Sequence, residues 1–293
     1  MKTLEYLRDY PDLFWPACLA AVALALLCSM LSVLVVLKRM AFIGQGISHA
    51  GFGGIGLAAV FGLASASLSP GATIAQFVVV LAFCIASALG VGILSSPQKQ
   101  GETHEDTAIG IVLVLSMAIG SVLVGIYSPR FQWESFLFGY LLNTGWADAW
   151  VAVGVSAGVL GALFWARRPL AFWAFDPRAA EAFGVRTGAV RVLLLVLLAV
   201  ATVTAMRLAG VVLASALLIL PGAASLKLSS RFGVVMGLSV ACAVAGVLAG
   251  LVLSFETNWP PGPSIVFALT AVYLASSVAG RVAAAPTVEG VVR

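Results

Sequence analysis

One histidine of this sequence lies inside a hydrophobic stretch, in the segment Arg39–Ala50. It is His49, one of two histidines in the chain; the other, His104, lies in a polar segment. Gln45 precedes His49 by four residues, so on a helix the two side chains share one face, one turn apart. A neutral imidazole binds zinc, manganese or iron, and a glutamine carbonyl is a weak oxygen donor. The pair predicts a transient metal contact, and the alternative is a histidine hydrogen-bonded to neighbouring backbone or to Ser48.

A second group of possible metal ligands lies in the segment Gln98–Asp106, which holds one histidine and three acidic residues. Acidic residues just before an apolar helix also favour its N-terminus through the helix dipole. Thr103 or Asp106 would serve as the cap. We interpret this segment as the start of a helix.

A short amphipathic helix is predicted between two hydrophobic runs, within Phe175–Val185. Asp176 is a capping residue, Pro177 takes the first helical position, and Gly184 follows the end of the pattern, with Ala180 in its middle. A short helix lying across a membrane face offers a docking point for a cytoplasmic partner. The alternative is a plain connector.

Motifs for catalysis are missing from the sequence. It contains no G-x-x-x-x-G-K-[ST], no Ser-His-Asp arrangement and no H-E-x-x-H. We therefore expect a protein that is not an enzyme, holds no permanent cofactor and hydrolyses no ATP by itself.

The segments that carry these residues belong to a membrane protein. Hydrophobic residues make up 61% of the 293 residues and charged residues 10%, whereas a soluble domain has roughly 25% charged residues. An ionisable side chain at bilayer depth usually faces a water-filled path or a partner, so a solute path is expected to pass His49. The net charge of +4 does not indicate nucleic-acid binding, because the basic residues lie at the ends of apolar runs.

The N-terminus and the cysteines fit the same interpretation. We expect no cleavable signal peptide, because the polar start Met1–Asp12 leads into a long apolar run without an A-x-A-like site. The four cysteines lie in apolar runs and form no C-x-x-C pair. They are expected to be small buried apolar residues, neither disulfides nor metal ligands: Cys18, Cys28, Cys84 and Cys242.

An all-α, polytopic bundle of eight or nine transmembrane helices is the predicted fold, since a crossing helix needs about 20 apolar residues. The sixth and seventh candidate runs join tightly around Arg207, which is why eight spans are also possible. Glycine pairs four residues apart, Gly154 with Gly158 and Gly246 with Gly250, predict close helix packing. The nine candidate runs are about 14–37, 41–64, 72–95, 107–127, 147–166, 190–206, 208–226, 232–254 and 263–280.

Lysine and arginine predict the orientation of these spans. If the Lys38–Arg39 end is cytoplasmic, 12 basic residues fall on the cytoplasmic side and 4 on the outer side, out of 16. This favours an N-terminus outside and a C-terminus in the cytoplasm. The outer group is Lys2, Arg8, Arg130 and Arg207; the cytoplasmic group is Lys38, Arg39, Lys99, Arg167, Arg168, Arg178, Arg186, Arg191, Lys227, Arg231, Arg281 and Arg293.

Together, several motifs in order make the chain resemble the membrane permease subunits of bacterial ABC importers for zinc, manganese and iron. The family usually has an aspartate four residues before this histidine, where this sequence has Gln45. Glu256 lies near a position where the family often has an acid at the outer mouth. The resembling segments are Lys38–Gly44 with Ser48–Ala50, Glu105–Ile111, Phe136–Leu142, Asp176–Gly184, Ala209–Leu213 with Leu218–Ala224, and Trp259–Pro263.

The resemblance implies a single transmembrane permease domain over 1–293, with a cytoplasmic coupling segment at about 169–189. It implies a multi-pass protein of the bacterial cytoplasmic membrane in which His49 and Gln45 contact a transported divalent metal. It also implies partners: cytoplasmic P-loop ATPase subunits docking at Asp176, Pro177, Ala180 and Gly184, an extracytoplasmic metal-binding protein, and a second permease copy or a related permease chain. No nucleic acid is implied.

Two other transport functions remain as alternatives. One is an ABC permease for an iron-chelate or cobalamin-like solute, which would need a wider path and gives no reason for His49. The other is an ion-gradient-driven secondary transporter, but such carriers usually place several acids within their spans. Here Glu134, Asp148 and Glu256 all lie near the ends of runs. A non-transporting scaffold would leave His49 unexplained.

Overall fold

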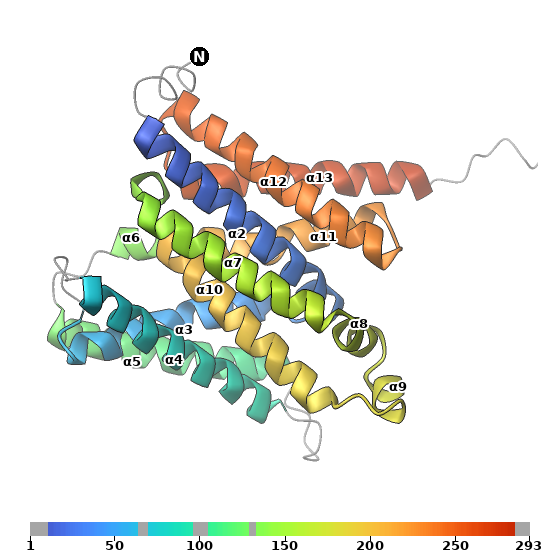
Figure 1. Ribbon diagram of the computed structural model, residues 1–293, viewed down its shortest axis with the longest axis horizontal. Helices are drawn as coiled ribbons and strands as arrows, with labels where there is room; N and C mark the ends of the chain where they lie inside the picture. Colours follow the sequence, from blue (N-terminus) through green and yellow to red (C-terminus); the bar gives the residue numbers. More distant parts are fainter. Residues whose placement is uncertain (1–10, 64–69, 96–104, 129–132, 285–293) are drawn as a thin grey trace, which may run out of the picture.

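The computed structural model describes residues 11–63, 70–95, 105–128 and 133–284, and these residues form helices and no strands. The predicted all-α bundle is confirmed (Figure 1). The helices are α2 (Pro11–Leu37), α3 (Ala41–Val60), α4 (Pro70–Leu94), α5 (Glu105–Tyr127), α6 (Trp133–Phe138), η1 (Leu141–Asn143), α7 (Trp146–Trp165), α8 (Arg167–Phe175), α9 (Pro177–Ala182), α10 (Thr187–Leu217), α11 (Leu220–Leu228), α12 (Phe232–Thr257) and α13 (Pro261–Ala284).

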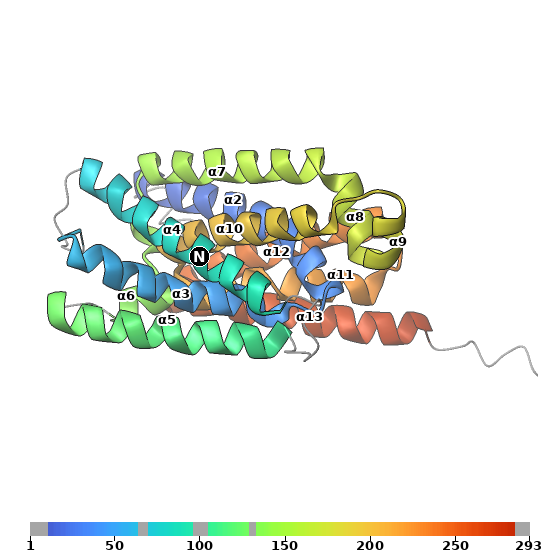
Figure 2. The same cartoon turned by 90° about the horizontal axis from the view of Figure 1, so that it is seen from below.

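Seven helical segments in the described residues are long and apolar enough to cross a membrane. α3 is not among them, because its six glycines together with Gln45 and His49 dilute its apolar content. With 20 residues, α3 is nevertheless about 30 Å long, the thickness of a hydrocarbon core. It lies among α4, α5 and α10 (Figure 2). We therefore count it as a further span.

The longest of the seven segments, Thr187–Leu228, bends and crosses twice. Gly210 has non-helical dihedral angles, φ 82° and ψ 165°. Near this bend, Gly262 at the start of α13 lies against Ala209; near the other end of α13, Gly280 lies against the carbonyl of Lys227. The 18 residues from Gly262 to Gly280 correspond to about 27 Å of helix. The chain therefore returns across the bundle after Gly210, and the described residues contain nine crossings, the larger of the two predicted numbers.

α2 lies at the centre of one half of the bundle, packed on α7, α10, α11 and α12. Serine hydroxyls link it to its neighbours: Ser156 donates to the carbonyl of Ala23 at 3.1 Å, and Ser239 donates to that of Ser29 at 2.8 Å. Ser32 accepts from the backbone N–H of Gly222 at 2.8 Å. Helices in lipid associate through such hydrogen bonds and through close packing of small residues, since lipid supplies no hydrophobic drive between them.

The basic residues gather at one end of the bundle, which we call the α8–α9 end. Lys38 lies over the ring of Trp173 in α8, and Arg191 donates to Ser95. At the opposite end, the α6 end, Arg207 is the one basic residue in the described part of the chain. Figure 1 shows α8 and α9 on one side and α6 on the other. The predicted charge asymmetry is thus an asymmetry between the two ends. Five of the sixteen basic residues lie outside the described residues: Lys2, Arg8, Lys99, Arg130 and Arg293.

The two glycine pairs predicted from spacing behave differently. A side chain at Gly246 or Gly250 would collide with Leu269 or with the backbone of Ile265 in α13, so this pair does bring α12 and α13 together. A side chain at Gly158, in α7, would meet nothing within 4 Å, and the same holds for Gly154. The prediction is therefore confirmed for Gly246 and Gly250, whereas Gly154 and Gly158 pack closely on no helix of the described chain.

Replacing Gly250 with alanine is expected to destabilise the bundle by about 1–3 kcal/mol, because the new methyl group overlaps backbone that cannot move aside cheaply. Gly158→Ala is the matched control and should leave stability unchanged or raise it slightly, since alanine favours helix and the site is open. Thermal unfolding of both variants in detergent measures the difference. Equal melting temperatures would show that α12 and α13 do not pack as closely as described.

Candidate functional site

α3 carries the two residues that the sequence predicts as metal contacts. His49 lies eight residues after Ala41, about 12 Å along a helix of about 30 Å, and is therefore near the middle of the span. Gln45 is exposed and His49 is partly buried. They lie one turn apart, as predicted, and Phe42, 58% exposed, lies on the same side of the helix one turn earlier.

His49 has a polar atom with no partner. Its Nδ1 is buried and forms no hydrogen bond with any described residue. The alternative partner, Ser48, donates instead to the carbonyl of Gly44 at 2.8 Å. A hydrogen bond from Ser48 is therefore not what holds the imidazole. A buried imidazole nitrogen without a donor or acceptor is costly in a low-dielectric setting.

One copy of this chain does not build a closed metal site. No group of three or more histidine, cysteine, aspartate or glutamate side chains comes together in the described residues. His49 and the amide of Gln45 supply at most two neutral ligands, whereas tight sites use three or four ligands, usually with anions among them. The residues fit a passing contact with a divalent metal rather than a resident one.

Only part of the other predicted ligand group lies in the described residues, and the cysteines form no metal-binding group there. α5 begins at Glu105, as expected for a helix start, while Glu102, Thr103 and His104 lie outside the described residues, so the capping interpretation stays a prediction. The thiol of Cys84 donates to the carbonyl of Ile47 at 3.7 Å. All four cysteines are free and buried or half-buried, as predicted.

The predicted short helix at the α8–α9 end is present as α9. The carboxylate of Asp176 accepts from the backbone N–H groups of Arg178 at 2.9 Å and of Ala179 at 3.0 Å, and Pro177 occupies the first helical position. Gly184 follows the helix in a left-handed conformation, φ 81°, so the chain can turn back toward α10. The sequence pattern and the local structure agree at every one of these positions.

Surface exposure divides the residues of this segment. Ala180 is fully buried, so it supports α9 from beneath and offers no contact surface. Phe183 is 79% exposed and projects beside Gly184, with its ring 5.6 Å from that of Phe172 in α8. Sequence analysis missed Phe183. An aromatic residue directly before the glycine that ends a short polar helix was the available signal.

The α6 end is built on a contact between two glycine backbones. Gly139, φ 69°, lies against the backbone of Ala209 and Gly210. A side chain at Gly139 would overlap the backbone near Gly210, and one at Gly210 would overlap the backbone near Gly139. The backbone N–H of Tyr140 donates to the carbonyl of Leu208 at 3.3 Å. Both glycines need their positive φ and their missing side chain here. This contact fixes where α10 bends.

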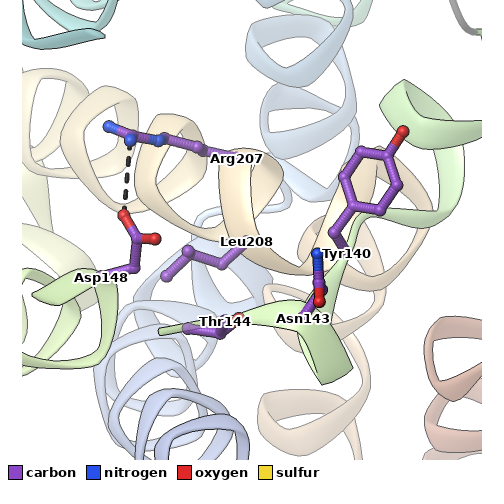
Figure 3. Close-up of a pocket in the computed structure, with 6 residues that line it drawn as sticks. All are labelled: Tyr140, Asn143, Thr144, Asp148, Arg207 and Leu208. Carbon is purple, nitrogen blue, oxygen red and sulfur yellow. Dashed lines mark hydrogen bonds and ion pairs between the residues drawn. The ribbon is translucent and has the colours of Figure 1, made fainter. Parts of the chain in front are cut away.

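A polar cavity of about 280 Å³ opens beside this bend (Figure 3). Arg207 points across it to Asp148 in α7, with Nη2 and Oδ1 3.4 Å apart, and its guanidinium also lies 5.7 Å from the ring of Phe77 in α4. Arg207 and Asp148 lie 59 residues apart in the sequence, and no local pattern predicted their contact. The cavity is lined by Tyr140, Asn143, Thr144, Asp148, Arg207 and Leu208.

Glu256, the predicted residue of the outer mouth, lies in the last turn of α12 at the same end and is partly buried. A second cavity of about 230 Å³ is found there, lined by Leu142, Ser254, Phe255, Asn258 and Trp259. Glu256 neighbours this cavity in sequence but does not line it. The site residues predicted from sequence thus occupy three separate places: mid-span on α3, α9 at one end, and α12 at the other.

Comparison with known proteins gives a consistent result. The sequence model described as the ABC 3 transport family matches residues 10–280. A manganese transport system membrane protein, MntC, of Halalkalibacterium halodurans is 32% identical over 87% of this chain and 82% of its own length. A probable iron transport system membrane protein of Haemophilus influenzae is 31% identical over 88% of this chain and 90% of its own.

Two solved structures have the same fold. PsaBC from Streptococcus pneumoniae, solved in complex with Fab, superposes with a TM-score of 0.78 at 25% identity and covers 93% of each chain. An inward-facing conformation of a putative metal-chelate type ABC transporter superposes with a TM-score of 0.61 at 16% identity, covering 96% of this chain and 87% of its own, a likeness of fold alone.

Proposed function

Because the chain belongs to the ABC 3 transport family, we propose that it is the permease subunit of an ATP-driven importer that moves a divalent metal ion, manganese, iron or zinc, into the cytoplasm. It is an integral, multi-pass membrane protein of a metal ABC transporter and not an enzyme. The relatives named for manganese and for iron support a divalent metal as the substrate.

The observation that carries the proposal is a polar pair at mid-span: the half-buried imidazole of His49 lies one turn from the exposed amide of Gln45. Hydrocarbon can hydrogen-bond neither side chain, so the exposed part of this face of α3 has to meet water, protein or substrate. A second copy of this chain or a related permease, facing α3, would enclose a polar path between the two chains. Such a path would hold two copies of the His49–Gln45 pair, which binds weakly enough to release its ion.

The two ends of the bundle fit different partners. The α8–α9 end is basic and presents α9 with the exposed Phe183, which suits a cytoplasmic P-loop ATPase that this sequence itself lacks. The α6 end, with Glu256 and its two cavities, would then face outward and receive metal from an extracytoplasmic binding protein. The proposed membrane is the bacterial cytoplasmic membrane, with the α8–α9 end on the cytoplasmic side.

The first prediction concerns the metal path. His49→Ala is expected to lower uptake of the transported metal by about tenfold or more, because a lost ligand worth about 1.4 kcal/mol or more changes affinity by that factor. Gln45→Asp adds a negative charge and should tighten binding while slowing release. Uptake of radioactive manganese, iron and zinc into vesicles containing the assembled transporter measures both effects and identifies the metal.

Thr202→Val is the matched control for His49→Ala. Thr202 is fully buried and its hydroxyl is the other buried side-chain polar atom without a partner in the described residues. Uptake should be unchanged, since valine fills the same volume. Normal uptake by His49→Ala would show that the imidazole only packs, and loss in both variants would point to a folding defect instead.

The second prediction concerns coupling. Phe183→Glu is expected to lose ATP-driven uptake and to weaken retention of the ATPase subunit, because it places a charge at the most exposed apolar point of the α9 segment. Phe61→Glu, also at an exposed phenylalanine (65%) but just after α3 at the α6 end, is the control and should keep both. Co-purification and ATP hydrolysis by the full complex are measured. Intact coupling in Phe183→Glu would remove the docking assignment.

The third prediction concerns orientation. In a cysteine-free background, a cysteine replacing the exposed Trp259 should react with a membrane-impermeant reagent added outside intact cells, and one replacing the exposed Arg178 should not. A permeant reagent should label both, which controls for local access. The reverse labelling pattern would invert the orientation given by the charge asymmetry.

A further inference from the structure

Two exposed arginines follow the last turn of α7, where the chain turns into α8. Arg167 and Arg168 are both exposed, and no carboxylate in the described residues pairs with either. The guanidinium of Arg167 lies 4.2 Å from the ring centre of Phe164. Phe164 is 67% exposed and Trp165 is 85% exposed. We call these four residues, 164, 165, 167 and 168, the basic corner.

The length of α7 places the basic corner at the edge of the bilayer. α7 has 20 residues, about 30 Å of helix, which matches the thickness of the hydrocarbon core. It begins at Trp146 and ends at Trp165, and tryptophan gathers at both membrane–water interfaces. Arg167 and Arg168, separated from Trp165 by one alanine, therefore lie at the depth of the lipid headgroups.

Packing of α8 fixes the direction of the arginines. Leu170, 1% exposed, and Trp173, 7% exposed, anchor the helix on the bundle, and the ammonium of Lys38 lies 4.0 Å from the ring centre of Trp173. With that side of α8 covered, Arg167 and Arg168 are left on the exposed side of its first turn. Stacking on Phe164 further restricts Arg167, so less rotamer freedom is lost when its guanidinium binds a ligand.

We propose that the basic corner binds the headgroup phosphate of an anionic phospholipid. A guanidinium holds phosphate through parallel hydrogen bonds, and two arginines without paired carboxylates favour a lipid of net negative charge over a zwitterionic one. The exposed rings of Phe164 and Trp165 lie where acyl chains meet headgroups. In Figure 2, α7 runs along one edge of the bundle, with α5 and α13 along the opposite edge, so none of the helices drawn covers the outer side of α7.

The test uses the full-length chain purified in detergent. Phosphatidylglycerol or phosphatidylcholine is titrated in, and bound lipid is counted by native mass spectrometry. The wild-type chain is expected to prefer phosphatidylglycerol. Arg167→Gln combined with Arg168→Gln should weaken that binding by about fivefold for each arginine, about 25-fold together. Phe164→Leu keeps both charges and should give an intermediate loss.

The matched control is Arg231→Gln combined with Arg281→Gln. It removes the same charge from two exposed arginines at the same end of the bundle, outside the basic corner. It should bind phosphatidylglycerol like the wild type. An equal loss in this control would reduce the effect to general charge attraction and overturn the proposal. Unchanged binding by the Arg167/Arg168 variant would also overturn it. So would a melting temperature showing that this variant is misfolded, if Phe164→Leu binds the lipid normally.

Two further measurements distinguish a bound lipid from a free anion and from a protein partner at the basic corner. Inorganic phosphate should not displace the lipid at matched concentration, since the acyl chains contribute through Phe164 and Trp165; efficient displacement would make the corner a simple anion site. If the Arg167/Arg168 variant kept its lipid and instead lost the ATPase subunit on purification, the corner would be a protein contact and the lipid assignment would be wrong.

Discussion

The bundle depends on the backbone contact between Gly139 and Gly210. A membrane protein has to pair its backbone polar groups internally, so a chain can turn back at the end of a span only where another segment satisfies the backbone of the bend. Here the segment after α6 lies directly on the bend, the N–H of Tyr140 binds the carbonyl of Leu208, and Gly262 closes the third side. Without side chains at these glycines, three stretches of backbone meet.

The bend decides what the second half of the chain can pack against. After Gly210 the chain returns along α13 and reaches α2, where Ser32 receives the N–H of Gly222. α12 and α13 then complete the same half of the bundle through Gly246 and Gly250. The charge pair Arg207–Asp148 lies directly before the bend and ties it to α7. A single local interruption of α10 therefore organises contacts among five helices.

The functional face of α3 follows from the same requirement that polar groups in a membrane find partners. The glycines of α3 allow close packing: Gly51 meets the side chain of Met206 in α10, and Gly44 meets that of Leu218. These contacts lie on the side of α3 away from His49, and within this chain Gln45 stays exposed and His49 half-buried. A polar face that its own chain does not hydrogen-bond is energetically costly in lipid. It becomes a binding site when another chain or a transported ion contacts it.

By itself, the sequence determined the class of fold, the approximate limits of the spans, the cap at Asp176 and the one-turn spacing of Gln45 and His49, because hydrophobic runs, caps and helical periodicity are local properties. It left the number of spans at eight or nine. Only the tertiary structure decided which of two equally spaced glycine pairs packs, that Ala180 is buried while Phe183 is exposed, and that Arg207 meets Asp148. These outcomes depend on which helix faces which, and a contact between residues 59 or more positions apart leaves no trace in local spacing.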